Sequence, residues 1–242
     1  MGFNEKVYVI DAGNTAIKVA LFEENKPVEV KRLKYVDLLK EDYYLNQNEK
    51  FRFGSSVLNE VRNQELKSIF PNLLFFDDKT KLPVKLNYKT TQTLGRDRIC
   101  NAVAAYSLFP HNNTLSIDIG TCVKYDFVSY KGIYEGGAIS PGINLRYKSL
   151  NEFTDNLPLI EAKTEVELLG KSTYESIHSG VINGIYAEII QTIKRYRCEF
   201  DDLKIIITGG DTKYFDFNGK KDTFVEENLT LKGLFQIFLL NV

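Results

Sequence analysis

The chain has 242 residues, enough for one large domain or two small ones with buried cores. Its hydrophobic and charged fractions, 43% and 26%, are ordinary for a globular protein, and its net charge of −1 argues against a nucleic-acid or membrane-surface partner. Neither a secretory segment nor a bilayer-spanning run is expected. Three widely spaced cysteines predict small buried side chains in a reducing cytoplasm, and two isolated histidines disfavour histidine-based metal sites.

In the first half of the chain, strand and helix patterns alternate. Strands are expected at 7–10, 17–22, 28–33, 51–57 and 73–77, with a helix near 59–70 and an extended segment at 83–88. A helix over 96–109 follows, because Ile99, Ala102, Val103 and Tyr106 recur at helical spacing. Pro110 ends this helix, so we expect a first domain of residues 1–112 and a second of 113–242.

The second half repeats the opening of the first. Strands are expected at 115–119, 123–129 and 204–208, with a Gly/Pro-rich stretch at 134–142 between them. Helices are expected at 143–153, from Ser172 or Thr173 to about Arg197, and near the C-terminus. Strand clusters alternating with helices, in two copies, predict an α/β fold of two similar domains with a cleft between them.

Two segments share one local pattern: VYVIDAGNTAIKVALF at 7–22 and LSIDIGTCVKYDFV at 115–128. Each predicts two strands joined by a tight glycine turn that follows an aspartate. Gly13 and Gly120 lack a Cβ, which permits positive φ and close approach of backbone amides to an anion. The aspartates would repel phosphate unless a cation lies beside them. One copy is ordinary turn chemistry, but two copies predict a phosphate group held by duplicated turns.

Two further motifs contain candidate site residues. A strand that ends in TGGD at 208–211 could place bare backbone against a base or sugar, although such a glycine pair is more often only a turn. The string GRDR at 95–98 places Asp97 between two arginines at a helix N-terminus, where its ionised form is favoured. Asp97 could simply stabilise the first turn, or it could accept the proton of a hydroxyl that attacks a phosphoryl group.

Six strings occur in an order that resembles a known family: DAGNTAIK, GRDRICNAVAA, DIGTCVKYD, GGAISPGINL, STYESIHSG and TGGD. Together they resemble the type III pantothenate kinases, of the actin/Hsp70/sugar-kinase superfamily, over nearly the whole chain. The resemblance implies a duplicated, actin-like (ribonuclease H-like) fold. It also implies ATP-dependent phosphorylation of pantothenate, the first step of coenzyme A biosynthesis.

The resemblance also assigns roles to individual residues. Asp97 would be the catalytic proton acceptor, and Asp118 would bind a monovalent cation, K⁺ or NH₄⁺. Asp11 would lie near Mg²⁺ through water. The implied pantothenate-binding residues are Tyr88, Gly95, Arg96, Asp97, Arg98 and Thr173. The implied ATP-binding residues are Asp11, Ala12, Gly13, Asn14, Thr15, Ala16, Ile17, Lys18, Thr121, Thr208, Gly209 and Gly210. Members of the family are homodimers, so a pantothenate site completed across a subunit interface is implied.

One position departs from the family pattern. Lys124 replaces the second threonine usual in the second phosphate motif. If it faces the phosphate site, it could bind phosphate or partly replace a cation; if it faces solvent, it would change nothing, and strand alternation leaves both open. Two other functions remain as alternatives: a kinase for another small hydroxyl substrate, and an ATP-binding regulator of the same fold, as relatives described as Bvg accessory factors are.

Overall fold

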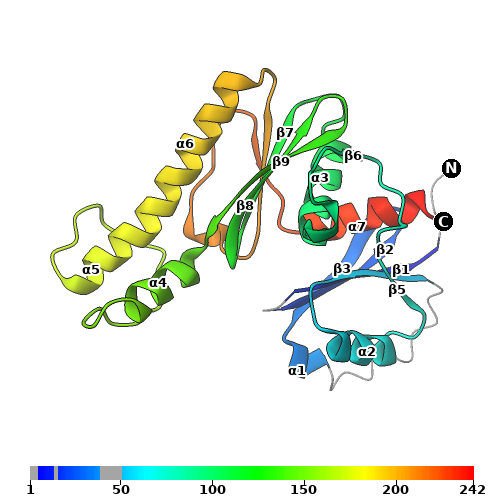
Figure 1. Ribbon diagram of the computed structural model, residues 1–242, viewed down its shortest axis with the longest axis horizontal. Helices are drawn as coiled ribbons and strands as arrows, with labels where there is room; N and C mark the ends of the chain where they lie inside the picture. The colour runs from blue at the N-terminus through cyan, green and yellow to red at the C-terminus, as the bar shows by residue number, and fades with distance from the viewer. Residues whose placement is uncertain (1–4, 14–15, 39–50) are drawn as a thin grey trace. The chain divides into compact units, whose positions relative to one another are not determined.

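The computed structural model describes residues 5–13, 16–38 and 51–242 (Figure 1). These residues form two compact units. The first unit comprises the described residues of 1–108 together with 229–242, and the second comprises 109–228.

The sheet of the first unit has the strand order β3-β2-β1-β4-β5. Strands β1 to β3 form an antiparallel meander, whereas β4 and β5 run parallel to β1. The central β1 is apolar and almost wholly buried, while the outermost β3 alternates exposed and half-buried residues. The strands are β1 (Val7–Ala12), β2 (Ile17–Glu23), β3 (Lys26–Leu33), β4 (Phe51–Ser56) and β5 (Leu73–Phe75).

The strands of the second unit repeat this topology in the order β9-β8-β7-β10-β11. Again three antiparallel strands are followed by two that run parallel to the first. The predicted duplicated α/β fold is therefore confirmed. The strands are β7 (Thr114–Ile119), β8 (Cys122–Ser129), β9 (Ile133–Pro141), β10 (Lys204–Thr208) and β11 (Thr223–Val225).

Strand β9 was expected only as a Gly/Pro-rich stretch. It pairs with β8 along its length, with a register shift between Phe127 and Val128. Gly136 adopts φ of 101° beside this irregularity, and a Cβ on Gly137 would collide with the backbone of Tyr125. The glycines are therefore those of a bulged strand, in which the extra residue and close backbone approach favour glycine.

The first unit contains short and long helices after its strands. These are α1 (Tyr35–Leu38), α2 (Glu60–Ile69), a 3₁₀ turn η2 (Thr91–Thr93), α3 (Arg96–Leu108) and α7 (Leu229–Leu240), with the short strand β6 (Lys85–Leu86) before η2. The side chain of Asn59 accepts a hydrogen bond of 3.0 Å from Arg62 N and so fixes the start of α2. The predicted helices at 59–70 and 96–109 are confirmed within two residues.

The helices of the second unit are α4 (Ile143–Glu152), α5 (Thr173–His178), a π-helical turn η3 (Ser179–Asn183), α6 (Gly184–Glu199) and a 3₁₀ turn η4 (Thr212–Tyr214). The single long helix expected from Ser172 to Arg197 is thus interrupted by η3. The apolar stripe of the expected helix is nevertheless buried; it consists of Ile177, Val181, Ile185 and Ile189. Ser172 caps the start of α5 by accepting a hydrogen bond from Glu175 N at 3.3 Å. Among the described residues, no helix has both the length and the apolar character needed to cross a membrane.

Helix α7 corrects the expected domain division. The sequence placed residues 113–242 in the second domain, but α7 belongs to the first unit, where it lies beside α3 (Figure 1). A Cβ on Gly233 would meet the carbonyl carbon of Cys100 at 2.6 Å, so glycine permits the close crossing of α3 and α7. Phe235 also stacks on Phe22 of β2, with ring centroids 4.2 Å apart. Most of α7 is apolar, and this packing removes it from water.

The three cysteines differ in exposure. Cys100 is buried, Cys122 is half-buried and Cys198 is exposed, and all three thiols are free. The expectation of three buried cysteines is therefore wrong for Cys198, which lies near the end of α6 on a part of the helix turned away from the core.

Candidate active-site residues

In the first unit, Asp11 lies near the carboxyl end of the central strand β1. Its neighbours across the sheet are Lys18 on β2 and Ser55 on β4. The Ser55 hydroxyl donates a hydrogen bond of 3.1 Å to Asp11 Oδ1. Because β1 and β4 are parallel, their polar ends meet at one edge of the sheet. Ser55 was not singled out from the sequence, although the Ser-Ser pair that ends an apolar strand was the available signal.

The turn after Asp11 is held by its own backbone. Gly13 N donates to Ala16 O at 3.1 Å, and Val57 N donates to Ala12 O at 3.1 Å. Gly13 does not have the positive φ that the sequence suggested; a Cβ there would instead lie 3.1 Å from Ala16 O. Glycine is therefore favoured at position 13 because the Ala16 carbonyl leaves little room for a Cβ, and not because the backbone has a left-handed conformation. Two predicted ATP-binding residues, Asn14 and Thr15, lie outside the described residues.

Helix α3 begins at the GRDR motif. The carbonyl of Gly95 accepts from Arg98 N at 3.1 Å and from Ile99 N at 3.2 Å, which closes the first turn. Asp97 Oδ1 accepts from Arg98 N at 2.9 Å, and a Cβ on Gly95 would lie only 2.6 Å from the same oxygen. Asp97 therefore sits against bare backbone, in the positive field of the helix N-terminus.

The two arginines of the motif have different environments. Arg98 is 5% exposed, which is unusual for an arginine. Arg96 is more accessible: its guanidinium lies 3.3 Å from Asp78 and 5.0 Å from the centre of the Phe76 ring. Tyr88 is half-buried in the segment between β6 and η2. The motif thus offers two guanidinium groups: that of Arg98 is buried, and that of Arg96 is partly exposed and contacts Asp78 and Phe76.

Cys100 is a buried residue of α3, one turn after the GRDR motif begins the helix. Burial raises the pKa of its thiol well above the ordinary value, and the negative charges of Asp11 and Asp97 raise it further. Both carboxylates therefore lie within electrostatic range of the same buried thiol, one turn into α3.

In the second unit, Asp118 occupies the same place on the central strand β7 as Asp11 does on β1. Its neighbours across the sheet are Lys124 on β8 and Thr208 on β10. Lys124 Nζ lies 2.6 Å from Asp118 Oδ2, and the two side chains are 17% and 15% exposed. The choice left open by the sequence is thereby resolved: Lys124 faces Asp118.

The turn after β7 has only Gly120 and Thr121 between its strands, and Gly120 N donates to Cys122 O at 3.0 Å. Gly120, like Gly13, does not adopt positive φ. The glycine that does is Gly209, with φ of 104°, where a Cβ would lie 2.6 Å from Asp118 Oδ1. The predicted residues Asp118, Thr121, Thr208 and Gly209 are thus brought together, with Gly210 next in the chain.

Gly142 contacts this turn, but sequence reasoning did not assign it to the site. It caps the N-terminus of α4 and its N–H donates to Thr121 O at 3.1 Å. A Cβ on Gly142 would collide with the carbonyl oxygen of Gly120 and would lie 2.7 Å from that of Thr121. The signal was present in the string GGAISPGINL, whose last glycine now has a geometric reason.

The start of α5 carries Thr173, which is exposed. It lies on a different element from the turn that contains Thr121.

Helix α6 is attached to the sheet by Glu188, whose carboxylate accepts hydrogen bonds from Tyr125 at 2.9 Å and from Ser140 at 2.6 Å and also pairs with Arg146. Burial raises the pKa of Glu188, but these donors outweigh it and hold the pKa below its usual value.

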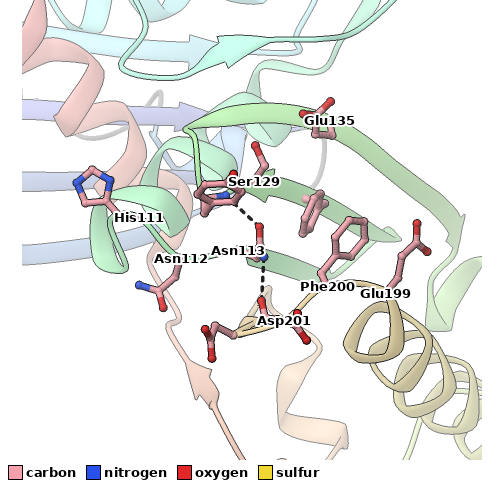
Figure 2. A pocket seen from close by; sticks show the side chains of 11 residues that line it. His111, Asn112, Asn113, Ser129, Glu135, Glu199, Phe200 and Asp201 are labelled. Carbon is pink, nitrogen blue, oxygen red and sulfur yellow. Dashed lines mark hydrogen bonds between the residues drawn. The ribbon is translucent and has the colours of Figure 1, made fainter.

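A hollow of about 720 Å³ in the second unit lies at the opposite ends of the same strands (Figure 2). Asn113 and Ser129, which line it, flank the pair Thr114 and Val128, whereas the glycine turn follows the pair Ile119 and Val123. The Asn113 side chain accepts from Tyr130 N at 3.0 Å and donates to Asp201 O at 2.8 Å. This hollow has no glycine turn and an acidic rim, so it does not fit a phosphate group.

The described residues contain no cluster of three or more histidine, cysteine, aspartate or glutamate side chains that could hold a metal ion. Asp11, with the Ser55 hydroxyl beside it, nevertheless offers oxygen ligands. Such a donor set fits Mg²⁺, which is usually bound by one or two carboxylates together with waters and substrate phosphates.

Comparison with known proteins adds independent information. Residues 7–195 match the family model described as type III pantothenate kinase. A type III pantothenate kinase of Christiangramia forsetii is 44% identical over 236 residues, which covers 93% of this chain and 95% of the relative. A second, from Cytophaga hutchinsonii, is 40% identical and covers 97% of this chain and 99% of the relative.

Among solved structures, a Campylobacter jejuni protein assigned to the Baf family of transcriptional activators has a TM-score of 0.66 and 24% identity. The match covers 97% of this chain and 98% of that one. At this identity the similarity supports the fold alone, and the two-unit α/β architecture agrees with it.

Proposed function

The chain belongs to the type III pantothenate kinase family and transfers phosphate from ATP to pantothenate in coenzyme A biosynthesis; we propose that Asp97 accepts the proton of the attacking hydroxyl. The observation that carries the role of Asp97 is its position in the first turn of α3, next to Arg98 and against the backbone of Gly95. A carboxylate held in this way is fixed in position, as a general base must be.

The chemistry follows from positioning and charge. The hydroxyl of pantothenate must lie in line with the γ-phosphoryl group, and the protein mainly orients the two and stabilises the charge between them. Asp97 would orient the hydroxyl and hold its proton at a carboxylate oxygen. Arg98 would offset negative charge there, because its guanidinium is buried and always protonated. Tyr88, Gly95, Arg96 and Thr173 complete the proposed pantothenate-binding set.

The two glycine turns are the proposed sites for the phosphates of ATP. The proposed phosphate-binding residues are Asp11 to Gly13 and Ala16 to Lys18 in the first unit and Thr121 in the second. Thr208 to Gly210 would lie beside the adenosine. The closely packed backbones around Gly13 and Gly142 support this assignment, because they fix the amides of each turn before ligand arrives. Asp11 would hold Mg²⁺ through water, and the ion would neutralise charge on the phosphates.

The family resemblance also assigns K⁺ or NH₄⁺ to Asp118. The residues present do not fit a second cation there, because Lys124 Nζ already lies 2.6 Å from Asp118 Oδ2. No part of the proposed mechanism therefore depends on such an ion.

A homodimer that completes the pantothenate site is part of the proposal. It is supported by exposed apolar side chains that follow α4 or lie near the start of α5: Phe153, Leu159, Leu168, Leu169 and Tyr174. Exposed apolar residues gathered in one stretch are typical of interaction surfaces. The free thiols of all three cysteines are consistent with a proposed cytoplasmic location.

The deciding experiment measures ADP release by the purified full chain with Mg²⁺ and ATP, with and without pantothenate. We expect ADP release to require pantothenate and to yield 4′-phosphopantothenate, identified by mass spectrometry. ATP binding without pantothenate-dependent turnover would instead favour an ATP-binding regulator, and turnover with another hydroxyl substrate would favour a different kinase activity. Sedimentation at several concentrations tests the dimer.

A further inference from the structure

We infer that the ammonium group of Lys124 takes the place of a monovalent cation beside Asp118, so that nucleotide binding and turnover do not require K⁺ or NH₄⁺. The inference rests on the proposed function for its link to catalysis, but its link to nucleotide binding can be measured separately. It concerns Lys124 and follows from three observations on the second unit.

The first observation is the register of β7 and β8. Asp118 and Lys124 are direct partners in this antiparallel pair, so both side chains project from the same face of the sheet. Lys124 Nζ lies 2.6 Å from Asp118 Oδ2, a charge-assisted contact at the short end of the usual range. The pair therefore brings a full positive charge to the oxygen that a bound cation would use.

The second observation is the limited space around the other oxygen of Asp118. The backbone of Gly209 is so close that a Cβ there would lie 2.6 Å from Oδ1. Gly209 adopts φ of 104°, which lets the strand end turn across the carboxylate. With Lys124 on one oxygen and the Gly209 backbone near the other, a large hydrated cation would have to displace a side chain of the protein.

The third observation is burial. The side chains of Asp118 and Lys124 are only 15% and 17% exposed, so the pair is poorly screened by salt. A second cation on the same carboxylate would be repelled by the ammonium group at short range. The lysine is also covalently attached, so its local concentration does not depend on the ions in solution.

These observations define the role of Lys124. Thr121 lies in the turn that follows Asp118, and Thr208 is the partner of Asp118 on β10. Both threonines are proposed nucleotide-binding residues. Lys124 would neutralise Asp118 and present positive charge to a phosphate bound by this turn. It is a binding and positioning residue, and the proton transfer remains with Asp97.

The test compares cations at constant ionic strength, replacing tetramethylammonium chloride with KCl or NH₄Cl. ADP release is quantified by chromatography, so that no coupling enzyme adds its own cation requirement. We expect kcat/KM of the unmodified protein for ATP to change by less than about twofold. Calorimetry with MgADP supplies a second readout, and its Kd should be equally insensitive to K⁺.

Two substitutions separate charge from space. Lys124→Thr removes the charge and opens the site, so activity and MgADP affinity without K⁺ should fall at least about tenfold and recover when K⁺ or NH₄⁺ is added. Lys124→Met removes the charge but fills the space, and we expect a similar fall with weaker recovery. Lys131→Thr, in the exposed turn at the other end of β8, removes the same charge and should leave both readouts unchanged.

Strong activation of the unmodified protein by K⁺ would overturn the inference, and this result needs no variant to fold. The inference would also be overturned if kcat/KM of Lys124→Thr were as insensitive to K⁺ as that of the unmodified protein. Failure of the unmodified protein to bind MgADP with any of the cations would overturn it too. Absence of pantothenate-dependent turnover together with K⁺-independent binding of MgADP would contradict the proposed reaction but support the role of Lys124.

Discussion

The two sheets place an aspartate at the same point, near the end of their central strand, but they surround it differently. Asp11 lies between Lys18 and Ser55 and accepts a hydrogen bond from the serine. Asp118 lies between Lys124 and Thr208 and forms a close ion pair with the lysine. One framework thus supports a carboxylate suited to a hard divalent cation and another that is already neutralised by the protein.

The connections within the two sheets differ as much as their aspartates. In the first unit, α2 links β4 to β5, and the proposed pantothenate-binding motif GRDR follows at the start of α3. In the second unit, the long insertion between β9 and β10 contains α4, α5 and α6, while β10 and β11 are joined without an α-helix. A repeated sheet topology therefore fixes where the turns lie, and the insertions decide which chemistry each unit adds.

The largest expected effect is a loss of kcat in a variant of Asp97, which would place the proton transfer in the first unit. Asp97→Asn keeps the size of the side chain but cannot accept the proton, so kcat should fall by about 10²–10⁴-fold. Binding of MgADP, measured by calorimetry, should change little. Asp37→Asn, on the exposed first turn of α1, removes the same charge and should keep full activity. Undiminished turnover in Asp97→Asn would refute the proposed role.

The next largest effect is a loss of stability in glycine variants, which would sharpen the contrast between the turn after β1 and the turn after β7. Gly142→Ala places a methyl group against the backbone of Gly120 and Thr121, so the free energy of unfolding should fall by about 1–3 kcal/mol. Among the described residues, Gly13→Ala meets Ala16 O at 3.1 Å, a milder contact, and should cost less. Denaturant titration measures both. Gly180→Ala, which meets nothing within 4 Å, is the matched control and should not destabilise the protein.

A smaller effect is expected at the Mg²⁺ side of the comparison. Ser55→Ala removes the hydrogen bond to Asp11 Oδ1, a change of about 0.5–1.5 kcal/mol in the energy of orienting that carboxylate. We expect the Mg²⁺ concentration for half-maximal activity to rise by about 2–10-fold, with kcat nearly unchanged. Ser68→Ala, on the exposed face of α2, provides a control. A loss confined to kcat would contradict this positioning role.

The smallest effect concerns pH, and it should belong to the second unit, which contains both histidines of the chain. Burial, and then the charge of Lys163, lower the pKa of His178 below its ordinary value of 6.5. The folded protein therefore binds fewer protons than the unfolded chain near this pH, and stability should decline as the pH falls from about 7 toward the lowered pKa. His178→Gln should reduce this slope in pH-dependent denaturant titrations.

The exposed His111→Gln substitution is the control for that measurement, because surface substitutions usually change stability little. An identical slope in His178→Gln would mean that other groups dominate the pH dependence. The hydrogen bond between Tyr147 Oη and His178 Nδ1, 2.8 Å long, would then be the feature to alter next.

Local patterns predicted the elements that have strong periodicity or clear end signals. Helices α2, α3 and α4 and the strands around both glycine turns were expected within a few residues, because apolar spacing and short-range backbone chemistry decide them. Strand β9 was missed, since its glycines look like a loop until a partner strand imposes the bulge. The π turn η3 was missed too, because the apolar stripe that crosses it is continuous.

The candidate site divides in the same way. Asp11, Asp97 and Asp118 could be selected from motifs and from the family resemblance. Ser55 and Gly142 could not be selected with equal reason, because their roles depend on neighbours that are distant in the sequence or on another element. The positive φ expected at Gly13 and Gly120 was wrong, since neither glycine adopts it, whereas close approach of their amides to an anion stays a prediction. Close backbone approach is a property of packing, which single-residue preferences do not contain.

By itself, the sequence determined the duplicated α/β pattern and the family, and it singled out Asp11, Asp97 and Asp118 as candidate site residues, because these depend on periodicity and on residue order. Only the tertiary structure decided that α7 joins the first unit and that Lys124 faces Asp118. A long apolar helix can be buried against either sheet, and a strand residue can face either side until its register is set. Contacts between residues far apart in the chain supply that information.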